Sequence, residues 1–331
     1  MDLWPKKQRV ALEEMISIAS KDPQAFAVFD ADNTLWHHDV EEALIAWMDF
    51  KSIIDLSQMN SYLLPIPPLR DESAYGYYSR LSQKSHASSY LWAVQTLAGF
   101  SLKEIQNMLD EMMSFKGLIP TTRTLKTNDR TEKKECFIET PTIFPAQSQL
   151  IKTLQKNNIN VWVVSASAED LVRMLCSNPH YGLCIPPEKI IGVNMLLTAT
   201  NGAIFSSAEE RIRGEKGFEY YFSEQRMNSR MTHHLYTPAT WYSGKVSGIK
   251  EWIHPSKRPF LVAGDSPNDF YMQFYADVNA GGIRLRITKN PKHKEDLRAM
   301  QQLYSEGPQD EKPYKGWVEV SPNELLGKEA I

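Results

Sequence analysis

The sequence predicts an α/β fold in which a parallel, Rossmann-like sheet is flanked by helices and carries an inserted, mainly helical domain. Short apolar runs at 26–30, 161–165 and 259–264 each stop at a small polar or acidic residue, a pattern typical of buried parallel strands. Helical patterns follow them. About 130 residues separate the first run from the second, whereas a strand-to-helix connection needs about 2–6, so a further module is inserted there.

Helical patterns fill most of the chain around these strands. Their apolar residues recur every three or four positions, which is the spacing of one helix face. A capping box of Ser101 and Glu104 marks the start of one helix. The expected helices cover residues 1–24, 41–50, 86–98, 101–114, 145–158 and 292–304.

The inserted module divides the chain into a cap and a core. The stretch from 120 to 141 is polar and charged and is expected to be a loop or hinge. Residues 40–139 are then expected to form a largely helical cap over the strand ends. The α/β core is expected to comprise residues 1–39 and 140–331.

A second, smaller insertion is expected at about 196–242. Within it, Thr200-Asn201-Gly202 is a hairpin signal, and the run from Arg211 to Lys216 is expected at the surface. Two further strands, at 283–287 and 316–319, complete the predicted sheet.

Composition places the chain among ordinary globular proteins. It has 331 residues, 42% of them hydrophobic and 23% charged, with a formal net charge of −3. This charge gives no case for binding to nucleic acid or to an anionic membrane. No stretch approaches the roughly 20 apolar residues of a membrane span. The start, Met1–Lys7, has no apolar signal segment, which favours a cytoplasmic protein; the alternative is an exported form that was trimmed.

Three cysteines, Cys136, Cys176 and Cys184, are too few for a disulfide framework. Their spacing also lacks the close pairs of a zinc site. They are expected to be reduced, and a Cys176–Cys184 bridge is the alternative in an exported protein.

The first strand carries the strongest chemical signal. It ends at Asp30, with Asp32 and the turn former Asn33 close behind. Carboxylates at the end of a buried strand are costly without a partner, and a divalent cation bound by oxygen ligands is the simplest one. Asp30 is then a candidate nucleophile and Asp32 a candidate proton donor and acceptor. The alternative is an ordinary strand that ends in an Asx-turn.

Polar residues also follow the later strands. Ser165 ends the second strand, and Ser167 is a candidate N-cap for the next helix, where a phosphate oxygen could bind. Lys245 opens a helical pattern, while Lys250, more than a turn further on, is expected to face solvent. The segment 264–269, Gly-Asp-Ser-Pro-Asn-Asp, follows the third strand. Each signal alone has an ordinary alternative: a strand ending on Ser, a surface lysine or a turn.

Together these residues resemble the haloacid dehalogenase-like (HAD) superfamily of hydrolases. That superfamily has Asp-x-Asp-x-Thr after the first strand, Ser or Thr after the second, a Lys, and Gly-Asp-x-x-x-Asp after a later strand. The resemblance covers the core, roughly half of the chain. The matching residues are Asp30, Asp32, Thr34, Ser165, Lys245, Gly264, Asp265 and Asp269.

The resemblance implies a Mg²⁺ site. Its ligands would be the Asp30 carboxylate, the Asp32 backbone carbonyl, the Asp265 carboxylate and Asp269, the last directly or through water. Oxygen ligands of this kind are the ones that Mg²⁺ prefers.

The resemblance also implies a phosphatase mechanism. Asp30 would attack the phosphorus of a monoester, and Asp32 would protonate the leaving alcohol and then activate water. Ser165 and Lys245 would hold the phosphoryl oxygens, and Thr34 would support the loop. The alternatives are a phosphotransferase that uses the same intermediate and a non-catalytic binding protein.

Within the superfamily the chain is similar to the bacterial phosphorylcholine phosphatases. The separations of Asp30 from Ser165 and of Lys245 from Asp265 are like theirs, and so are the phrases 33–39, 42–47 and 262–267. This similarity implies phosphorylcholine, or a similar small phosphorylated amino alcohol, as the substrate. Phosphoserine, phosphoethanolamine and sugar phosphates are the alternatives.

The predicted cap is rich in aromatic residues, which hold quaternary ammonium groups when a carboxylate lies nearby. Asp71 and Glu72 are the expected carboxylates. The alternative is that the rings form the core of the cap itself. The cap rings are Trp47, Tyr62, Tyr75, Tyr77, Tyr78, Tyr90 and Trp92, and the expected substrate contacts are Ser165, Ala166, Trp36, Glu72, Tyr78 and Trp92.

Two neighbouring histidines, His37 and His38, follow the first motif. Mg²⁺ prefers oxygen ligands, and neither histidine has a spaced histidine partner, so both are expected at the surface or in packing. The expected partner of the chain is therefore a small phosphorylated metabolite. The sequence leaves the oligomeric state open.

Overall fold

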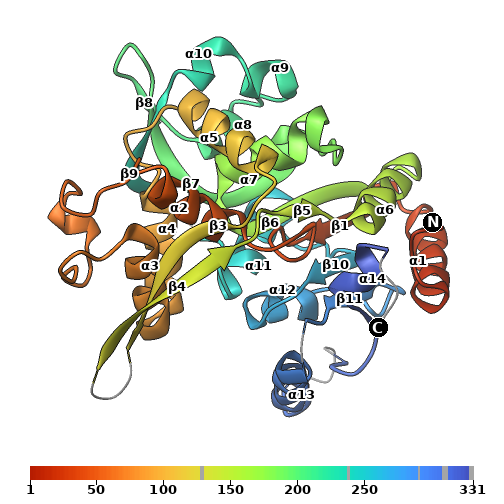
Figure 1. Ribbon diagram of the computed structural model, residues 1–331. Coiled ribbons are helices and arrows are strands. Elements are labelled where there is room, and N and C mark those ends of the chain that lie inside the picture. The colour runs from red at the N-terminus through yellow and green to blue at the C-terminus, as the bar shows by residue number, and fades with distance from the viewer. Residues whose placement is uncertain (127–129, 237–238, 290, 308–311, 328–331) are drawn as a thin grey trace.

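The computed structural model describes residues 1–126, 130–236, 239–289, 291–307 and 312–327. Six parallel strands form the centre of its main sheet (Figure 1), which confirms the predicted α/β class. The chain order reverses between β1 and β10, as in a Rossmann sheet. In order across the sheet, the six strands are β7 (Ile190–Thr198), β6 (Asn160–Ala168), β1 (Phe26–Phe29), β10 (Leu261–Gly264), β11 (Ile283–Ile287) and β12 (Trp317–Val320).

Both faces of this sheet are covered by helices, so its strands are apolar at nearly every position. Phe26 and Val28 of β1 pack towards α11 (Ser243–Trp252) and α12 (Phe270–Phe274). Ala27 and Phe29 pack on the opposite face. That face is covered by α1 (Lys6–Ala19), α6 (Pro145–Lys156), α7 (Glu169–Ser177) and α14 (Pro322–Leu325).

The segment between β1 and β6 contains the helices that the sequence predicts there, and also α3, which it does not predict. The capping box of Ser101 and Glu104 is present at the start of α5. The elements are α2 (Val40–Phe50), the 3₁₀ turn η1 (Ser61–Leu63), α3 (Ala74–Lys84), α4 (His86–Gln95) and α5 (Leu102–Ser114). Two short strands, β2 (Trp36–His37) and β5 (Thr142–Ile143), pair where this segment joins the core.

The prediction of a loop at 120–141 is wrong. These residues form an antiparallel hairpin of β3 (Ile119–Lys126) and β4 (Thr131–Ile138), which extends away from the body (Figure 1). β3 packs against α3, where the Thr124 N–H donates to Ser79 Oγ at 3.0 Å. β4 is exposed at most positions, so its sequence is polar and charged and lacks an apolar strand pattern.

The smaller insertion packs against β7. The predicted hairpin is confirmed: β8 (Ile204–Phe205) pairs antiparallel with β7, and Gly202 in the turn has φ = 84°. Arg211, expected at the surface, instead pairs with Glu169 at 2.5 Å. The insertion also contains α8 (Ser207–Ile212), α9 (Phe218–Tyr221), α10 (Glu224–Met227) and β9 (Arg230–Tyr236). The remaining elements lie outside it and are the helix α13 (Pro291–Ser305) and the 3₁₀ turns η2 (Pro179–Tyr181), η3 (Pro187–Lys189) and η4 (Pro267–Asp269).

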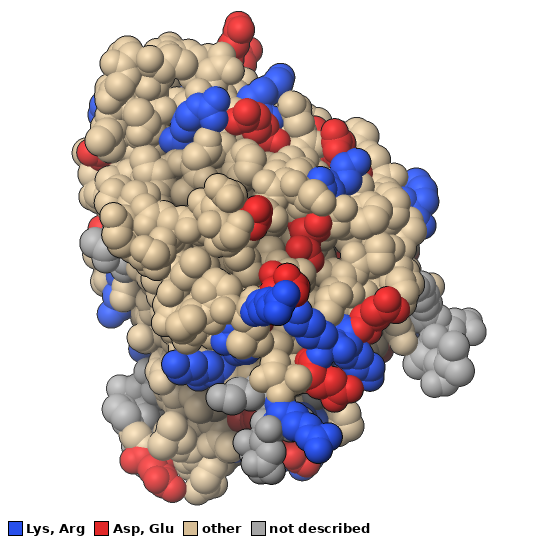
Figure 2. All heavy atoms as spheres, turned by 60° about the vertical axis from the view of Figure 1, so that its left-hand side comes forward, with Lys and Arg blue, Asp and Glu red and all other residues tan. Residues whose placement is uncertain are grey.

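The outer surface agrees with the near-neutral composition. On the face drawn in Figure 2, Lys and Arg alternate with Asp and Glu rather than gathering into a patch of one sign. No helix in the described ranges is both long enough and apolar enough to cross a bilayer. Cys136, Cys176 and Cys184 are all free thiols, so the alternative of a Cys176–Cys184 bridge is not realised.

Candidate active site

A cavity of about 160 Å³ opens at the carboxyl ends of β1, β6 and β10. This is the point where the strand order reverses, and open α/β sheets bind their ligands at such points. Core loops line one side of the cavity, and residues of α2, α3 and α4 line the other. The lining residues are Asp30, Asp32, Asn33, Asp39, Glu41, Tyr78, Tyr90, Ser165, Ala166, Ser167, Asp265, Ser266, Asn268 and Lys289.

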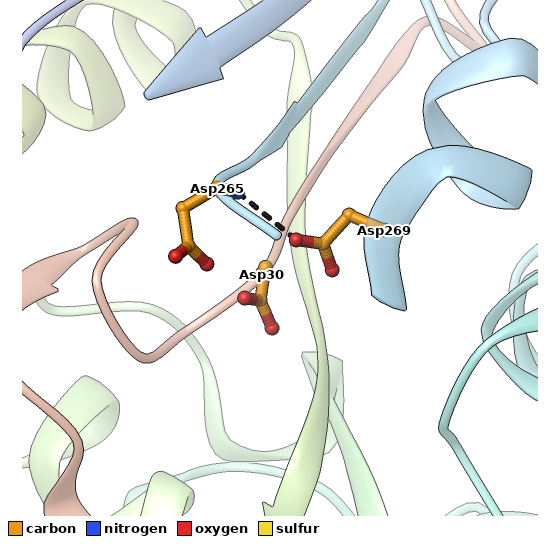
Figure 3. A group of neighbouring side chains, drawn as sticks. All are labelled: Asp30, Asp265 and Asp269. Carbon is orange, nitrogen blue, oxygen red and sulfur yellow. Dashed lines mark hydrogen bonds between the residues drawn. The ribbon is translucent and has the colours of Figure 1, made fainter. Parts of the chain in front are cut away.

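Three carboxylates converge beside this cavity (Figure 3). Asp30 follows β1, Asp265 follows β10 and Asp269 ends η4; one oxygen of each lies within 4.8 Å of the others. Asp269 is fixed because its Oδ2 accepts the backbone N–H groups of Asp265 and Ser266, both at 2.9 Å. A Cβ at Gly264 would lie 2.5 Å from the Asp269 Cβ, so this close approach requires glycine.

Lys245 pairs with two of the three carboxylates. Its Nζ lies 2.5 Å from Asp30 Oδ1 and 2.6 Å from Asp269 Oδ1, and its side chain is fully buried. Burial raises the pKa of Asp269, but Lys245 more than offsets this, and the pKa is lowered overall. Lys250 is exposed, as expected, with its Nζ 5.5 Å from the centre of the Tyr275 ring.

The three carboxylates suit a hard divalent cation. No described residue donates a hydrogen bond to Asp30 Oδ2 or Asp265 Oδ1, although both residues line the cavity. Burial and the neighbouring Asp269 raise the pKa of Asp30 well above its usual range, so its charge is undercompensated. An all-oxygen set with open positions fits Mg²⁺ or a similar ion.

Asp32 is held by three donors. Trp36 Nε1 and the Val40 N–H donate to Oδ1 at 2.8 and 2.7 Å, and Ser167 Oγ donates to Oδ2 at 2.7 Å. Burial raises the pKa of Asp32, while these hydrogen bonds work in the opposite direction. A carboxyl group with a raised pKa is suited to general acid catalysis near neutral pH.

The turn after β6 differs from the prediction in one respect. Ser167 is not the N-cap of α7, because β6 continues irregularly to Ala168, which precedes the helix. The hydroxyl of Ser167 therefore binds Asp32 instead. Ser165 and Ala166 line the cavity, and Ser165 Oγ accepts the Ser167 N–H at 3.1 Å.

Two predicted residues lie behind the cavity wall. Thr34 is fully buried, and its carbonyl accepts a hydrogen bond from Gln147 Nε2 at 2.9 Å. Trp36 is also fully buried and reaches the site only through its bond to Asp32. Asn33 has φ = 56°, in agreement with the predicted turn.

The other wall of the cavity combines two tyrosines with two acids. Tyr78 of α3 and Tyr90 of α4 line it together with Asp39 and Glu41. Burial raises the pKa of both acids well above the usual range. Glu41 Oε1 accepts the Ala168 N–H at 2.6 Å, which ties α2 to the turn after β6. This wall can surround a small group that is apolar and positively charged.

Besides Trp36, the expected substrate contacts Glu72 and Trp92 do not line the cavity, and neither does the expected carboxylate Asp71. Glu72 is paired with Arg80 at 2.6 Å, and Asp71 lies 3.5 Å from Arg70. Trp92 is 1% exposed, and its ring centre lies 4.9 Å from that of Tyr77. Trp92 therefore supports the wall from behind.

Asp39, Glu41 and Lys289 line the cavity without having been expected there, and Tyr90 was expected only as one cap ring among several. Asp39 had a local signal, because it precedes an amphipathic helix and is the N-cap of α2. Glu41 and Lys289 had none, because their position depends on how α2 and the loop after β11 pack. His38, expected in packing or at the surface, pairs with Glu139 at 3.2 Å.

The sequence matches no protein-family model. A phosphorylcholine phosphatase of Pseudomonas aeruginosa is 32% identical to this chain over 335 residues, which cover 98% of this chain and 93% of that enzyme. The chain belongs to the phosphorylcholine phosphatase family. This membership confirms the resemblance to HAD hydrolases and makes the chain a phosphoric monoester hydrolase for a small phosphorylated substrate.

A solved structure supports the fold of this phosphatase family member. A conserved protein of unknown function from Anaerococcus prevotii aligns with a TM-score of 0.60 over 92% of this chain and 91% of its own. Its sequence is 18% identical, so the likeness concerns the fold alone.

Proposed function

We propose that the protein is a Mg²⁺-dependent phosphatase that acts on phosphorylcholine, or a similar small phosphorylated amino alcohol, through a phosphorylated Asp30. One observation carries the proposal: Asp30 is held by Lys245 through one oxygen, and its other oxygen, beside the cavity, has no donor among the residues that the structure describes. The relative with 32% identity supports the substrate class.

Asp30 is the nucleophile of the proposed reaction. Its Oδ2 forms a bond to phosphorus as the bond from phosphorus to the leaving oxygen breaks, which gives an aspartyl-phosphate. Lys245 holds Asp30 Oδ1, so the carboxylate keeps one orientation. Lys245 also adds positive charge beneath the site as charge develops on the phosphoryl oxygens.

Asp32 moves the proton in both halves of the reaction. Protonated Asp32 gives its proton to the leaving alkoxide, and ionised Asp32 then takes a proton from the water that attacks phosphorus. That attack restores the Asp30 carboxylate and releases phosphate. The donors from Trp36, Val40 and Ser167 fix the carboxyl group for both steps.

The metal would be held by Asp30, Asp265 and the backbone carbonyl of Asp32, with Asp269 in direct contact or through water. When bound, Mg²⁺ would neutralise charge on the phosphoryl oxygens. Ser165 lies across the cavity and is proposed to bind one phosphoryl oxygen. Thr34 is proposed to support the loop from behind.

The wall of Tyr78, Tyr90, Asp39 and Glu41 is proposed to bind the leaving group. Aromatic faces attract a trimethylammonium group by about 0.5–2 kcal/mol each. The two acids favour a cation. Burial disfavours their ionised forms, and a cation bound beside them would stabilise those forms. We also propose residues 40–139 as a cap domain, which contributes Glu41, Tyr78 and Tyr90 to the wall, whereas Asp39 belongs to the core.

Substrate turnover with defined metal content tests this proposal. Metal-free enzyme should hydrolyse p-nitrophenyl phosphate only after Mg²⁺ or a similar hard cation is added. With Mg²⁺, kcat/KM should be highest for phosphorylcholine, lower for phosphoethanolamine and lowest for phosphoserine, whose carboxylate would meet Asp39 and Glu41. Full activity in EDTA would disprove the metal role, and a faster reaction with phosphoserine or a sugar phosphate would disprove the substrate.

A further inference from the structure

Lys289 lies in the loop after β11 and contacts the metal-binding carboxylates. Its Nζ is 2.6 Å from Asp265 Oδ2, and its side chain is 29% exposed. Among the described residues that line the cavity, it alone carries a positive charge. A dianionic phosphate would meet five carboxyl groups and this one ammonium group there.

The two lysines of the site differ in how firmly they are held. Lys245 is fully buried between two carboxylates, so moving it would leave charges unpaired in the core. Among the described residues Lys289 has one carboxylate partner, and its side chain is partly exposed. Lysine also has a flexible four-carbon stem. Lys289 can therefore leave Asp265 while remaining at the cavity.

Arg286, on β11 just before the loop of Lys289, does not share this freedom. It is fully buried, its Nη1 donates to the Ser266 carbonyl at 2.9 Å, and its guanidinium lies 4.8 Å from the centre of the Phe270 ring. Arg286 fixes the loop that carries Asp265. The exchangeable charge in this part of the site belongs to Lys289.

A divalent cation at Asp265 would repel the Lys289 ammonium group from its present position. The ion would carry two positive charges and would bind the same carboxylate that the ammonium group contacts, within a few ångströms of it. Because Asp265 is buried, water screens this repulsion only in part. The ammonium group and the metal therefore compete for Asp265.

We propose that Lys289 is an exchangeable counter-ion, which neutralises Asp265 in the metal-free enzyme and binds the substrate phosphate once the metal has taken Asp265. This inference rests on the metal site of the proposed function. It adds a second lysine to the phosphate site, with a role that depends on metal occupancy. Under this proposal, removal of Lys289 strengthens metal binding. If Lys289 were instead a fixed partner that only orients Asp265, its removal would weaken metal binding, typically by about 10–100-fold.

Direct metal binding separates these two roles. Calorimetry with Mn²⁺ and Mg²⁺ on the metal-free full chain would compare wild type with Lys289→Met and the charge-preserving Lys289→Arg. Lys294→Met is the matched control, because Lys294 is exposed and lines the adjoining groove beside Lys289. We expect Lys289→Met to bind metal at least about 10-fold more tightly, with the other two close to wild type. Unchanged or weaker binding by Lys289→Met would overturn the exchange.

Steady-state kinetics at saturating Mg²⁺ tests the second half of the exchange. The KM of Lys289→Met for p-nitrophenyl phosphate should rise by about 10-fold, with a smaller change in kcat, because one charge-assisted contact to phosphate is lost. An unchanged KM would also overturn the exchange. If wild type binds neither metal, the proposed function fails as well; if it binds metal and Lys289→Met is no tighter, the exchange alone fails.

Discussion

Two buried groups of charges lie on either side of the turn from β6 into α7, and they are built differently. The first, which we term the balanced cluster, joins α7 to the smaller insertion. Arg226, for example, lies 2.9 Å from both Asp170 and Glu210. The balanced cluster comprises Glu169, Asp170, Glu210, Arg173, Arg211 and Arg226.

The second group, which we term the open cluster, lines the cavity. Asp32, Asp39 and Glu41 have no cation within ion-pair distance in the described ranges, and Asp265 keeps one oxygen without a donor. The open cluster comprises Asp30, Asp32, Asp39, Glu41, Asp265 and Asp269, with Lys245 and Lys289.

The pKa values follow this difference. Burial raises the pKa of Glu169 and of Asp170, but the guanidinium groups beside them more than offset it, and both values are lowered. In the open cluster burial dominates at most of the acids, and the pKa values of Asp30, Asp39 and Glu41 are raised well above their usual range. Asp269 is the exception, because Lys245 beside it lowers its pKa. Burial alone therefore does not mark a reactive site. Incomplete compensation of buried charge does mark such a site, because a metal ion or a charged substrate can bind there and neutralise the remaining charge.

The largest expected effect is on stability, in the balanced cluster. Arg226→Met should lower the free energy of unfolding by about 3–5 kcal/mol, because Asp170 and Glu210 would each lose a buried partner. Chemical denaturation monitored by circular dichroism measures this. Arg213→Met, at an exposed position, should change it by less than about 0.5 kcal/mol. Equal effects of the two variants would contradict the stabilising role of the balanced cluster.

The next effect is on catalysis, in the open cluster. Lys245→Ala should reduce kcat/KM for p-nitrophenyl phosphate by about 10²–10³-fold, because a charge next to the nucleophile is lost. Lys250→Ala should have little effect, because Lys250 lies five residues further along the same helix and is exposed. The reverse ranking would show that the phosphate lysine is wrongly assigned.

A smaller effect concerns substrate preference. Tyr78→Ala should reduce the preference for phosphorylcholine over phosphoethanolamine by an amount equivalent to about 0.5–2 kcal/mol, while p-nitrophenyl phosphate turnover changes less. Tyr62→Ala is the control, since Tyr62 is 82% exposed. The ratio of kcat/KM values measures the preference. An unchanged ratio in Tyr78→Ala would remove this ring from the leaving-group site.

The smallest effect is a shift in pH dependence. Ser167 donates to the ionised form of Asp32, so Ser167→Ala should raise the pKa of Asp32 further. If protonated Asp32 is the general acid, the alkaline limb of the pH profile of kcat should move to higher pH. A move to lower pH would mean that another group controls this limb.

Sequence reasoning reached the core strands and the motif residues because their signals are local. The run 26–30 and the strand at 283–287 agree with β1 and β11, and the capping box at Ser101 agrees with α5. Asp30, Asp265 and Asp269 come together because parallel strands end at one edge of the sheet, which the order of elements already implies.

The features that sequence reasoning missed depend on contacts between distant segments. The hairpin of β3 and β4 has an exposed, charged strand, so no apolar alternation marks it. Glu72 is paired with Arg80, and Trp92 lies behind Tyr78, neither of which follows from helical spacing alone. Lys289 reaches Asp265 from a loop, where side-chain direction has no period to predict it.

The most direct test of the account is whether Asp30 carries the phosphoryl group during turnover. Wild-type enzyme would be mixed with Mg²⁺ and phosphorylcholine, quenched in acid within the first turnover, and digested for mass spectrometry. The account predicts one phosphoryl group on the peptide that contains Asp30, and a loss of about 10⁴-fold or more in turnover for Asp30→Asn, which should remain folded. A phosphoryl group on another residue, or turnover by Asp30→Asn within a few-fold of wild type, would contradict it.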